Sequence, residues 1–313
     1  MVNADAGVQQ SAERRVVVVF NPAKIGDEPS FRRITTRVAA QHGWPEPTFL
    51  ATSTEDPGHG MAQQALDSGA TLVLAAGGDG TARVVSTTLS HTKVPCAILP
   101  LGTGNLLARN LEIPLDLEDA LHVAFTGVPR AIDLAQVVVD HDSANATRFT
   151  GMAGVGFDAA MMRDTDERLK RIVKNVAYVV AFTKHMTAPP RRVSVQVDYQ
   201  PAFHRKALLM IVGNTSSLQG GIVLFPKARP DDGRLDLLLA APTSLGMWAR
   251  VASAVLRRIT RNKAVDYRSG TRFVLSLDEP TPWEVDGDTE GEGSHFEFSV
   301  DPGALLVVTP RPR

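Results

Sequence analysis

This chain of 313 residues has a single cysteine, no long apolar run and almost no excess of either charge. Cys96 is the only cysteine, which excludes an intrachain disulfide and suits a reducing cytoplasm. No stretch approaches the roughly 18 consecutive apolar residues of a membrane-spanning helix, and residues 1–15 are too polar for a signal peptide. The formal net charge of -1 argues against nucleic-acid binding through bulk positive charge. We therefore expect a cytoplasmic protein, soluble or at most peripheral on a membrane.

The composition is otherwise that of a globular protein with a substantial core. Apolar residues make up 43% of the chain and charged residues 21%, which is ordinary for such proteins. At about 150 residues per domain, the length predicts two domains. The polar residues 1–15 are expected to form a disordered tail.

The first half alternates between strand and helix patterns. Apolar strand patterns occur at residues 16–20, 48–51, 71–76 and 95–99, and helical patterns at 31–38, 61–66, 81–89, 106–110 and 117–124. This alternation predicts a mainly parallel sheet covered by helices. In such sheets, ligands bind outside the carboxyl ends of the strands.

The third of these strands ends in an unusual turn, Gly77-Gly78-Asp79-Gly80-Thr81. Glycines let the backbone approach a ligand closely, and the N–H groups at the start of the following helix can bind anionic oxygens. The carboxylate of Asp79 would repel phosphate unless a metal ion lay between them. The turn therefore indicates a site for a nucleotide polyphosphate with Mg²⁺, and the alternative is a tight turn with no ligand.

Two further turns follow neighbouring strands in the same way. Asn21 and Pro22 come directly after the first strand, and residues 102–105 follow the fourth. Because the carboxyl ends of parallel strands meet at one edge of a sheet, the three turns are expected to converge there. Their convergence is the strongest physical argument for a nucleotide site in the first half.

After Asp133 the pattern changes to short alternating strands. Val193, Val195 and Val197 alternate with polar residues, as do Phe296 and Phe298. This pattern predicts a mainly antiparallel sandwich with helical insertions near residues 167–186 and 245–263. We expect a nucleotide-binding α/β domain at residues 16–135 and a sandwich domain at 136–313.

The ordered motifs resemble those of the diacylglycerol kinase catalytic family, which includes sphingosine and ceramide kinases. The resemblance rests on the three turns of the first half and, in the second half, on the motifs Gly154-Val155-Gly156-Phe157-Asp158, Gly220-Gly221, Asp232-Gly233-Arg234-Leu235-Asp236 and Asp286-Gly287-Asp288. It implies a first domain like those of phosphofructokinase and NAD kinase. The glycine turn alone is shared with NAD kinases, whereas the ordered set is more specific to lipid kinases.

The resemblance also implies roles for individual residues, with ATP at the strand ends and lipid in the cleft between the domains. It assigns the nucleotide to Asn21, Pro22, Thr54, Gly77, Gly78, Asp79, Gly80, Thr81, Gly102, Thr103, Gly104 and Asn105. Asp79 would face phosphates that carry Mg²⁺. In the family, the loop matching Asp232 and Gly233 holds a structural Mg²⁺, so Asp232 becomes a candidate ligand. A plain Asp-Gly hairpin turn is the alternative reading of those two residues.

The second-domain carboxylates supply the expected catalytic groups. Asp288 occupies the position of the family's general base, and Asp286 would orient it or hold metal. Asp79 would face the phosphates that carry Mg²⁺. The family has glutamate where this chain has Asp288, aspartate where it has Leu106, and glutamate where it has Val84. An acceptor hydroxyl needs a carboxylate within about 3 Å, so the shorter aspartate must lie closer to the nucleotide.

These features predict an ATP-dependent lipid kinase that converts diacylglycerol to phosphatidic acid. The alternatives are an NAD kinase and an inactive nucleotide- or lipid-binding protein. Basic, partly apolar segments around residues 168–182 and 245–263 favour contact with an anionic membrane surface, and solvated helix faces are the other reading. We expect no nucleic-acid partner, and an edge strand could pair across a homodimer. The identity of the acceptor hydroxyl depends on pocket shape, which the sequence leaves open.

Overall fold

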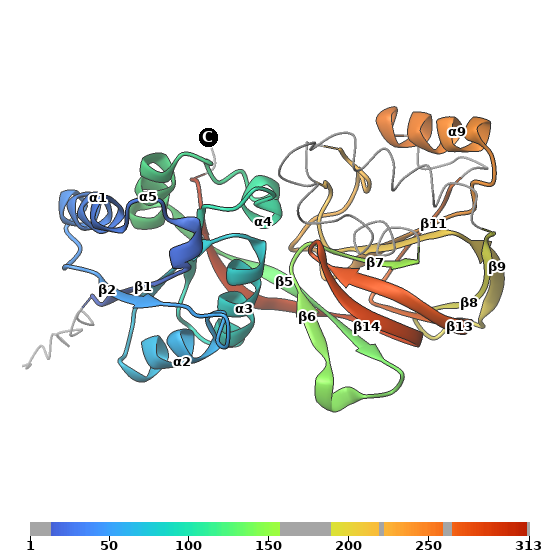
Figure 1. The fold of residues 1–313 in the computed structure, drawn as a ribbon, viewed down its shortest axis with the longest axis horizontal. Helices are drawn as coiled ribbons and strands as arrows, with labels where there is room; N and C mark the ends of the chain where they lie inside the picture. Colours follow the sequence, from blue (N-terminus) through green and yellow to red (C-terminus); the bar gives the residue numbers. More distant parts are fainter. Residues whose placement is uncertain (1–13, 157–188, 219–221, 259–264, 312–313) are drawn as a thin grey trace, which may run out of the picture.

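A computed structural model describes residues 14–156, 189–218, 222–258 and 265–311. The predictions for the tail at 1–13, the helical insertion at 167–186, Phe157, Asp158, Gly220 and Gly221 lie outside these residues. Within them, the chain forms two bodies side by side, joined by two long strands that run through both (Figure 1). The first is an α/β domain and the second a mainly antiparallel sandwich, as the sequence predicts.

The first body contains four parallel strands. In chain order its elements are β1 (Val16–Phe20), η1 (Pro22–Lys24), α1 (Glu28–Gln41), β2 (Thr48–Ala51), α2 (His59–Asp67), β3 (Leu72–Gly77), α3 (Asp79–Leu89), β4 (Cys96–Pro100), α4 (Leu106–Asn110) and α5 (Leu117–Thr126). The strand order is β4-β3-β1-β2. Helices α1 and α5 cover one face and α2 and α3 the other (Figure 1). The carboxyl ends of β1, β3 and β4 therefore meet at one edge.

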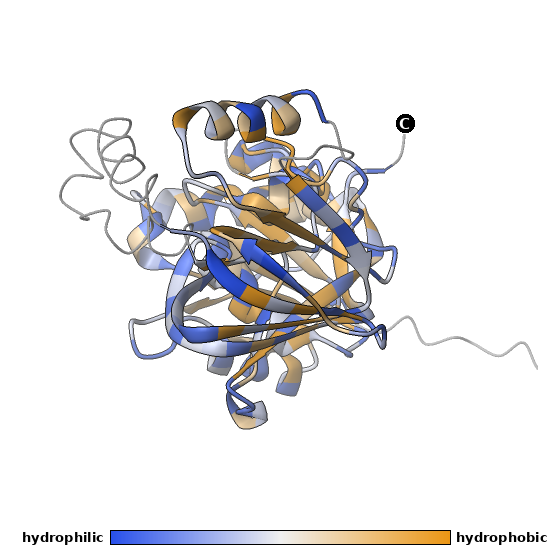
Figure 2. Ribbon diagram, turned by 90° about the vertical axis from the view of Figure 1, so that its right-hand side faces the viewer, coloured by the Kyte–Doolittle hydropathy of each residue, from blue (hydrophilic) through white to orange (hydrophobic). Residues whose placement is uncertain are grey.

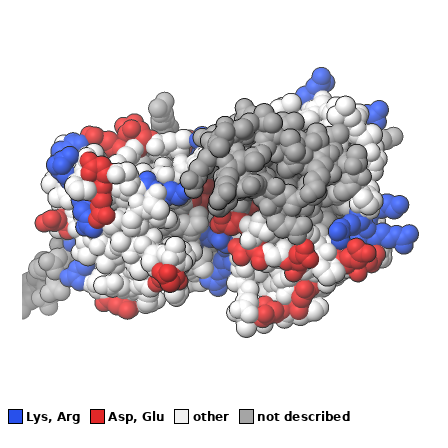
Figure 3. All heavy atoms as spheres, viewed as in Figure 1, with Lys and Arg blue, Asp and Glu red and all other residues white. Residues whose placement is uncertain are grey.

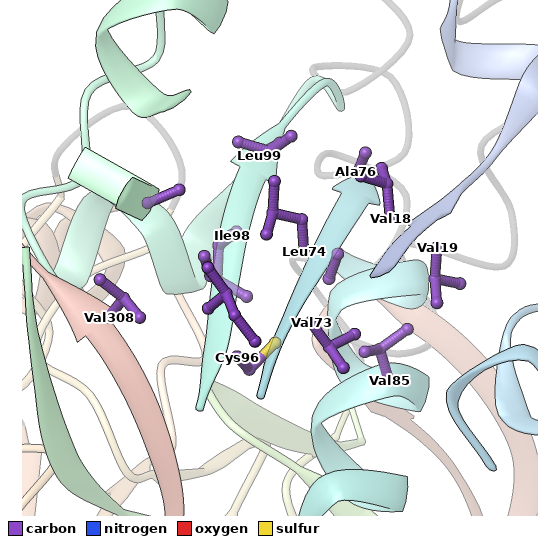
Figure 4. Close-up of a cluster of buried hydrophobic side chains, with 14 of the residues drawn as sticks. Val18, Val19, Val73, Leu74, Ala76, Val85, Cys96, Ile98, Leu99 and Val308 are labelled. Carbon is purple, nitrogen blue, oxygen red and sulfur yellow. The ribbon is translucent and has the colours of Figure 1, made fainter. Parts of the chain in front are cut away.

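The core of the first body is made of β-branched and aliphatic side chains. Figure 4 shows Val18, Leu74, Ile98 and Val85 of α3 gathered around the sheet, with Cys96 among them. Cys96 is fully buried, and burial raises the pKa of its thiol to about 12. The thiol is therefore a small core group, and the burial of whole strands explains their continuous apolar runs.

The second body is built from longer, antiparallel strands. Its elements are β5 (Val128–Val139), η2 (Ser143–Asn145), β6 (Thr147–Phe149), β7 (Met152–Gly156), β8 (Arg191–Val197), β9 (Phe203–Ala207), β10 (Leu209–Gly213), β11 (Leu235–Ala240), α9 (Leu245–Leu256), β12 (Val265–Gly270), β13 (Arg272–Val285) and β14 (Asp288–Thr309). Apolar residues alternate with polar ones along several of these strands, as the hydropathy colouring shows (Figure 2). The inward residues form the core between the sheets.

Helix α9 lies outside the sandwich, on the far face of its sheet. Val251, Ala254 and Val255 of α9 pack against Ile211 of β10 and Leu238 of β11. Ser244 caps the helix by accepting a hydrogen bond from the N–H of Met247. Among the described residues, no helix has the length and apolar character needed to cross a membrane.

Strand β14 is much longer than the alternation around Phe296 and Phe298 indicates. It is one strand with an irregularity between Asp301 and Leu305, and its last part returns to the first body, where Val307 pairs in parallel with Cys96. Three residues of this part, Leu305, Val307 and Val308, thus contribute to the first core, although the sequence places all of 136–313 in the second domain. The long strand β5 likewise crosses the expected boundary at residue 135.

Asp133 explains how the irregularity in β14 is held. Its carboxylate is almost fully buried and accepts hydrogen bonds from the N–H groups of Gly233, at 2.7 Å, and Gly303, at 2.8 Å. Gly303 has a φ of +63°, a left-handed conformation that glycine adopts without strain. Asp133 therefore fixes two turns of the second body from the strand that links the bodies.

Candidate active site

The 77–81 turn and the 102–105 turn lie against each other. A Cβ atom added to Gly102 would come within 2.6 Å of the Cα of Gly78, a distance at which the backbones would have to move apart. The N–H of Leu101 also donates to the carbonyl of Gly77 at 2.8 Å. Glycine is thus required here by the close approach of two backbones, and the predicted convergence of these turns is present.

Asp79 begins α3, two residues before the helix start that the sequence suggested. Its Oδ1 accepts a hydrogen bond from the N–H of Leu106 at 2.5 Å, at the start of α4. Burial raises the pKa of Asp79, and the nearby carboxylate of Asp288 adds to this, while the N–H groups of residues 105–107 oppose it. Asp79 therefore connects the glycine turn to the loop after β4 and lies close enough to Asp288 of the second domain to be affected by its charge.

The remaining predicted nucleotide residues line the same edge, and several also stabilise their own turns. Asn21 follows β1 and accepts from the N–H of Ala23 at 3.0 Å, with Pro22 beginning η1. Asn105, at φ +50°, accepts from the N–H of Gly102 at 2.9 Å and donates to its carbonyl at 2.8 Å. Thr54 lies in the loop after β2 and donates to Glu55 at 2.7 Å. Contact of these side chains with a nucleotide stays a prediction.

Other predicted positions are part of the loops themselves. The side chain of Thr81 is buried beneath Gly77, where an added Cβ would come within 2.6 Å of it. Thr103 is exposed, and the carbonyl of Gly104 accepts from Nε of Arg109 at 2.9 Å. Exposed Thr103 is therefore the hydroxyl of this loop most accessible to a ligand.

Lys24 is a residue of the site that the sequence analysis missed. It ends η1, and its Cε lies 4.0 Å from the position of a Cβ on Gly78. An ammonium group beside a glycine turn is a point charge suited to phosphate oxygens. In the sequence, Lys24 is recognisable only as a basic residue three positions after Asn21. The fold shows that it reaches the neighbouring loop.

The second domain contributes the hairpin turn between β13 and β14. Asp286 and Gly287 are its two central residues, with φ of +49° and +91°, as a two-residue hairpin of the I′ type requires. The buried carboxylate of Asp286 accepts from the N–H groups of Thr150, Gly151 and Met152 at 3.2, 2.9 and 3.0 Å. Asp286 therefore anchors the turn to the 150–152 segment.

The protonation of Asp286 is set by competing effects. Burial raises its pKa to about 6, while the three N–H donors and the positive charge of Arg83 act in the opposite direction. Glu284, also buried, accepts from the N–H of Gly287 at 2.7 Å. The two buried carboxylates thus fix the shape of the turn, and Asp288 directly after it is left to face outward.

Asp288 lies beside the glycine turn of the first domain. Its Oδ2 is 3.5 Å from the position of a Cβ on Gly80, and its side chain is 58% exposed. Arg83 of α3 contacts Asp288 at 3.2 Å and Glu290 at 2.8 Å. Acidic and basic side chains meet along the junction of the bodies (Figure 3). The expected arrangement, with a carboxylate of the second domain facing the turn of the first, is therefore present.

The donors for a metal ion differ between the two predicted positions. Mg²⁺ commonly binds one or two carboxylates together with substrate phosphates, and the carboxylate of Asp79 in the glycine turn fits that pattern. Asp232 is largely exposed, and partial desolvation of its carboxylate together with the charges of Asp133 and Asp231 raises its pKa. In the described part of the chain, no group of three or more His, Cys, Asp or Glu side chains is arranged to hold a metal. Asp232 as a ligand stays a prediction.

The α/β domain and the antiparallel sandwich together are those of a lipid kinase of the diacylglycerol kinase type. A family model for the diacylglycerol kinase catalytic domain matches residues 15–137, and one for the YegS C-terminal NAD kinase beta sandwich-like domain matches residues 151–309. A Yersinia pestis protein named "Probable lipid kinase YegS-like" is 33% identical over 265 residues, 80% of this chain and 84% of its own.

Solved structures share the fold. A diacylglycerol kinase from Bacillus anthracis superposes with a TM-score of 0.75 at 20% identity, covering 95% of this chain and 97% of its own. Yeast NADH kinase in complex with NADH gives 0.53 at 10% identity, covering 97% and 85%. The chain belongs to the family of YegS-like lipid kinases of the diacylglycerol kinase type.

Proposed function

We propose that this lipid kinase transfers the γ-phosphate of ATP to the hydroxyl of diacylglycerol and releases phosphatidic acid and ADP. The position of Asp288 carries the proposal, because a carboxylate of the second domain lies against Gly80 of the glycine turn. An acceptor hydroxyl between Asp288 and a nucleotide on that turn would be in reach of both.

The chain's own residues would act by positioning and charge. N–H groups of the 77–81 turn and the ammonium of Lys24 would bind the phosphates. Asp288 would accept the proton of the lipid hydroxyl as its oxygen bonds to the γ-phosphorus and the bond from that phosphorus to the ADP oxygen breaks. Asp79 would face the phosphates and help to hold Mg²⁺, which when bound neutralises phosphate charge. Asp286 would keep the turn in place.

An acceptor panel tests this proposal. Labelled ATP is incubated with the enzyme and diacylglycerol, monoacylglycerol, a sphingoid base, ceramide or NAD. The proposal predicts labelled phosphatidic acid as the main product and no labelled NADP. NADP as the main product would establish the rival kinase activity, and ATP binding by calorimetry without any phosphorylated acceptor would establish an inactive binding protein.

Peripheral membrane binding through α9 would bring the enzyme to its lipid. Leu245 and Leu256 are 71% and 75% exposed, and Arg250, Arg257 and Arg258 are exposed on the same segment. Residues 237–265 contain no acidic side chain. Such a helix can lie on an anionic lipid surface with its apolar residues in the interface.

Vesicle sedimentation tests this contact. We expect the protein to sediment with anionic vesicles at low salt and to be released at high salt, because attraction between exposed charges is screened. Replacing both Leu245 and Leu256 by serine should weaken the binding several-fold, at about 25 cal/mol per Å² of apolar surface. Equal binding to anionic and zwitterionic vesicles, or none at low salt, would contradict it.

A further inference from the structure

Arg83 is the basic residue that joins the two halves of the site. It lies on α3 one turn after Asp79, and its guanidinium contacts the carboxylates of Asp288 and Glu290 on β14. The two acidic residues are two positions apart on β14, beside an irregularity in its pairing with β13, and the same guanidinium reaches both. One arginine of the first domain therefore binds the beginning of β14 by two ion pairs.

The surroundings of Arg83 separate it from an ordinary surface ion pair. Its side chain is only 16% exposed, and its Nε is buried without a hydrogen-bond partner among the described residues. Its charge also acts on the buried carboxylate of Asp286. Exposed ion pairs contribute little, whereas a largely buried guanidinium that binds two carboxylates at once restricts where both of them lie.

The short side chain of the candidate base, Asp288, explains why its strand must be held close to α3 by the ion pairs of Arg83. Asp288 is one methylene shorter than glutamate, so its carboxylate reaches the acceptor only if the hairpin lies close to α3. The oxygen of Asp288 that lies 3.5 Å from the position of a Cβ on Gly80 is Oδ2, the same oxygen that Arg83 binds. Arg83 thus binds the same short side chain, Asp288, that needs β14 to lie close to α3.

We infer that Arg83 is a positioning residue, which holds the start of β14 against α3 so that the Asp288 carboxylate reaches the reacting hydroxyl. The inference rests on the proposed function, because it presupposes that Asp288 accepts the proton. Lysine cannot replace arginine here, because an ammonium lacks the rigid fork that spans two carboxylates. Because Arg83 acts through Asp288, its loss is expected to leave ATP binding unchanged.

Rescue by a longer base separates positioning from general stabilisation. The experiment measures kcat, the KM for ATP and the urea midpoint of unfolding for wild type, Arg83→Ala, Arg83→Lys, Asp288→Glu and the double variant Arg83→Ala with Asp288→Glu. Arg148→Ala is the matched control, because Arg148 of β6 also crosses between the bodies, donating to Ser90 at 3.0 Å. That contact lies at the other end of α3, away from the carboxylates.

Arg83→Ala should lower kcat by about 10²-fold, the lower end of the range for losing a general base, with the KM for ATP little changed. Arg83→Lys should remain low. Adding Asp288→Glu to Arg83→Ala should restore kcat about tenfold, because the longer side chain regains the lost reach. Arg148→Ala should keep the wild-type kcat even if its urea midpoint falls.

Three outcomes would overturn the inference while wild type remains an active lipid kinase: full kcat in Arg83→Ala, no rescue by Asp288→Glu, or an equal loss of kcat in Arg148→Ala. A wild-type enzyme that phosphorylates none of the lipids would instead refute the proposed function, and this inference with it. The two failures are therefore distinguished by the wild-type measurement alone.

Discussion

Asp286 and Asp288 are two residues apart and have opposite surroundings. Asp286 turns inward at a left-handed φ and binds three backbone N–H groups, while Asp288 begins β14 and faces the first domain. The hairpin turn produces this difference, since its first central residue points back at the 150–152 segment. One short acidic motif thus supplies both an anchor and a candidate base.

The raised pKa of Asp286 predicts a specific dependence of stability on pH. Its pKa is about 6 in the folded protein against an ordinary value of 3.8, so the folded state holds the proton more tightly. The contribution of the protonated Asp286 carboxyl to the stability of the fold is therefore fully present below pH 3.8 and is lost as the pH rises through about 6. The free energy of unfolding of wild type, relative to Asp286→Asn, should fall by about 3 kcal/mol over that range.

Urea unfolding of both proteins across this pH range provides the measurement. Carboxylates whose pKa is lowered, such as Asp140 and Asp198, contribute to the free energy of unfolding, and this contribution is lost as the pH falls. They do so in both proteins, so their effect cancels in the difference. A difference that stays constant, or that grows as the pH rises, would show that Asp286 does not carry the raised pKa.

At the scale of elements, the site depends on two loops that pack backbone to backbone. Gly102 has no room for a side chain, because a Cβ would meet Gly78 at 2.6 Å and Oδ1 of Asn105 at 2.9 Å. Gly26 of the same domain is a matched control, since an added Cβ would have no described atom within 4 Å. Comparing alanine at Gly102 with alanine at Gly26 therefore isolates the effect of pushing the 77–81 and 102–105 turns apart.

Gly102→Ala should weaken ATP binding by at least about tenfold and cost about 1–3 kcal/mol of stability, as overpacking does. Gly26→Ala should leave both values close to wild type. Calorimetry with ATP and thermal unfolding measure the two effects. Wild-type ATP affinity in Gly102→Ala would mean that contact between these loops is not needed for the nucleotide.

The elements of this chain were predictable wherever the pattern is local. Continuous apolar runs indicated β1, β3 and β4, and the turns after them indicated the edge where they converge. The single long strand β14 was not predictable, because Pro302 and Gly303 are typical of a break. Asp133, distant in sequence, supplies the hydrogen bond that carries the strand through Gly303.

Contacts between residues of different domains could also not be predicted from the sequence. Arg83 lies more than 200 positions from Asp288 and Glu290, so no local pattern connects them. Lys24 reaches the glycine turn only because β1 and β3 are neighbours in the sheet. The sequence predicted the types of group in the site, while the pairing between them required the fold.

At the scale of the whole molecule, α4 links the two bodies at a further point. Its last residue, Asn110, accepts from the N–H of Ser217 at 3.1 Å and from its hydroxyl at 2.9 Å, and donates to its carbonyl at 3.0 Å. Its first residue, Leu106, is bound by Asp79. The candidate phosphate site and the second domain are therefore connected through one short helix as well as through β5 and β14.

The rate of phosphoryl transfer by Asp288→Asn tests the central claim most directly. Asp67→Asn on the exposed face of α2 is the control, and ATP binding is measured by calorimetry for both variants. We predict that Asp288→Asn binds ATP like wild type but forms phosphatidic acid about 10²–10⁴-fold more slowly, while Asp67→Asn is unaffected. Transfer at the wild-type rate by Asp288→Asn would contradict the account.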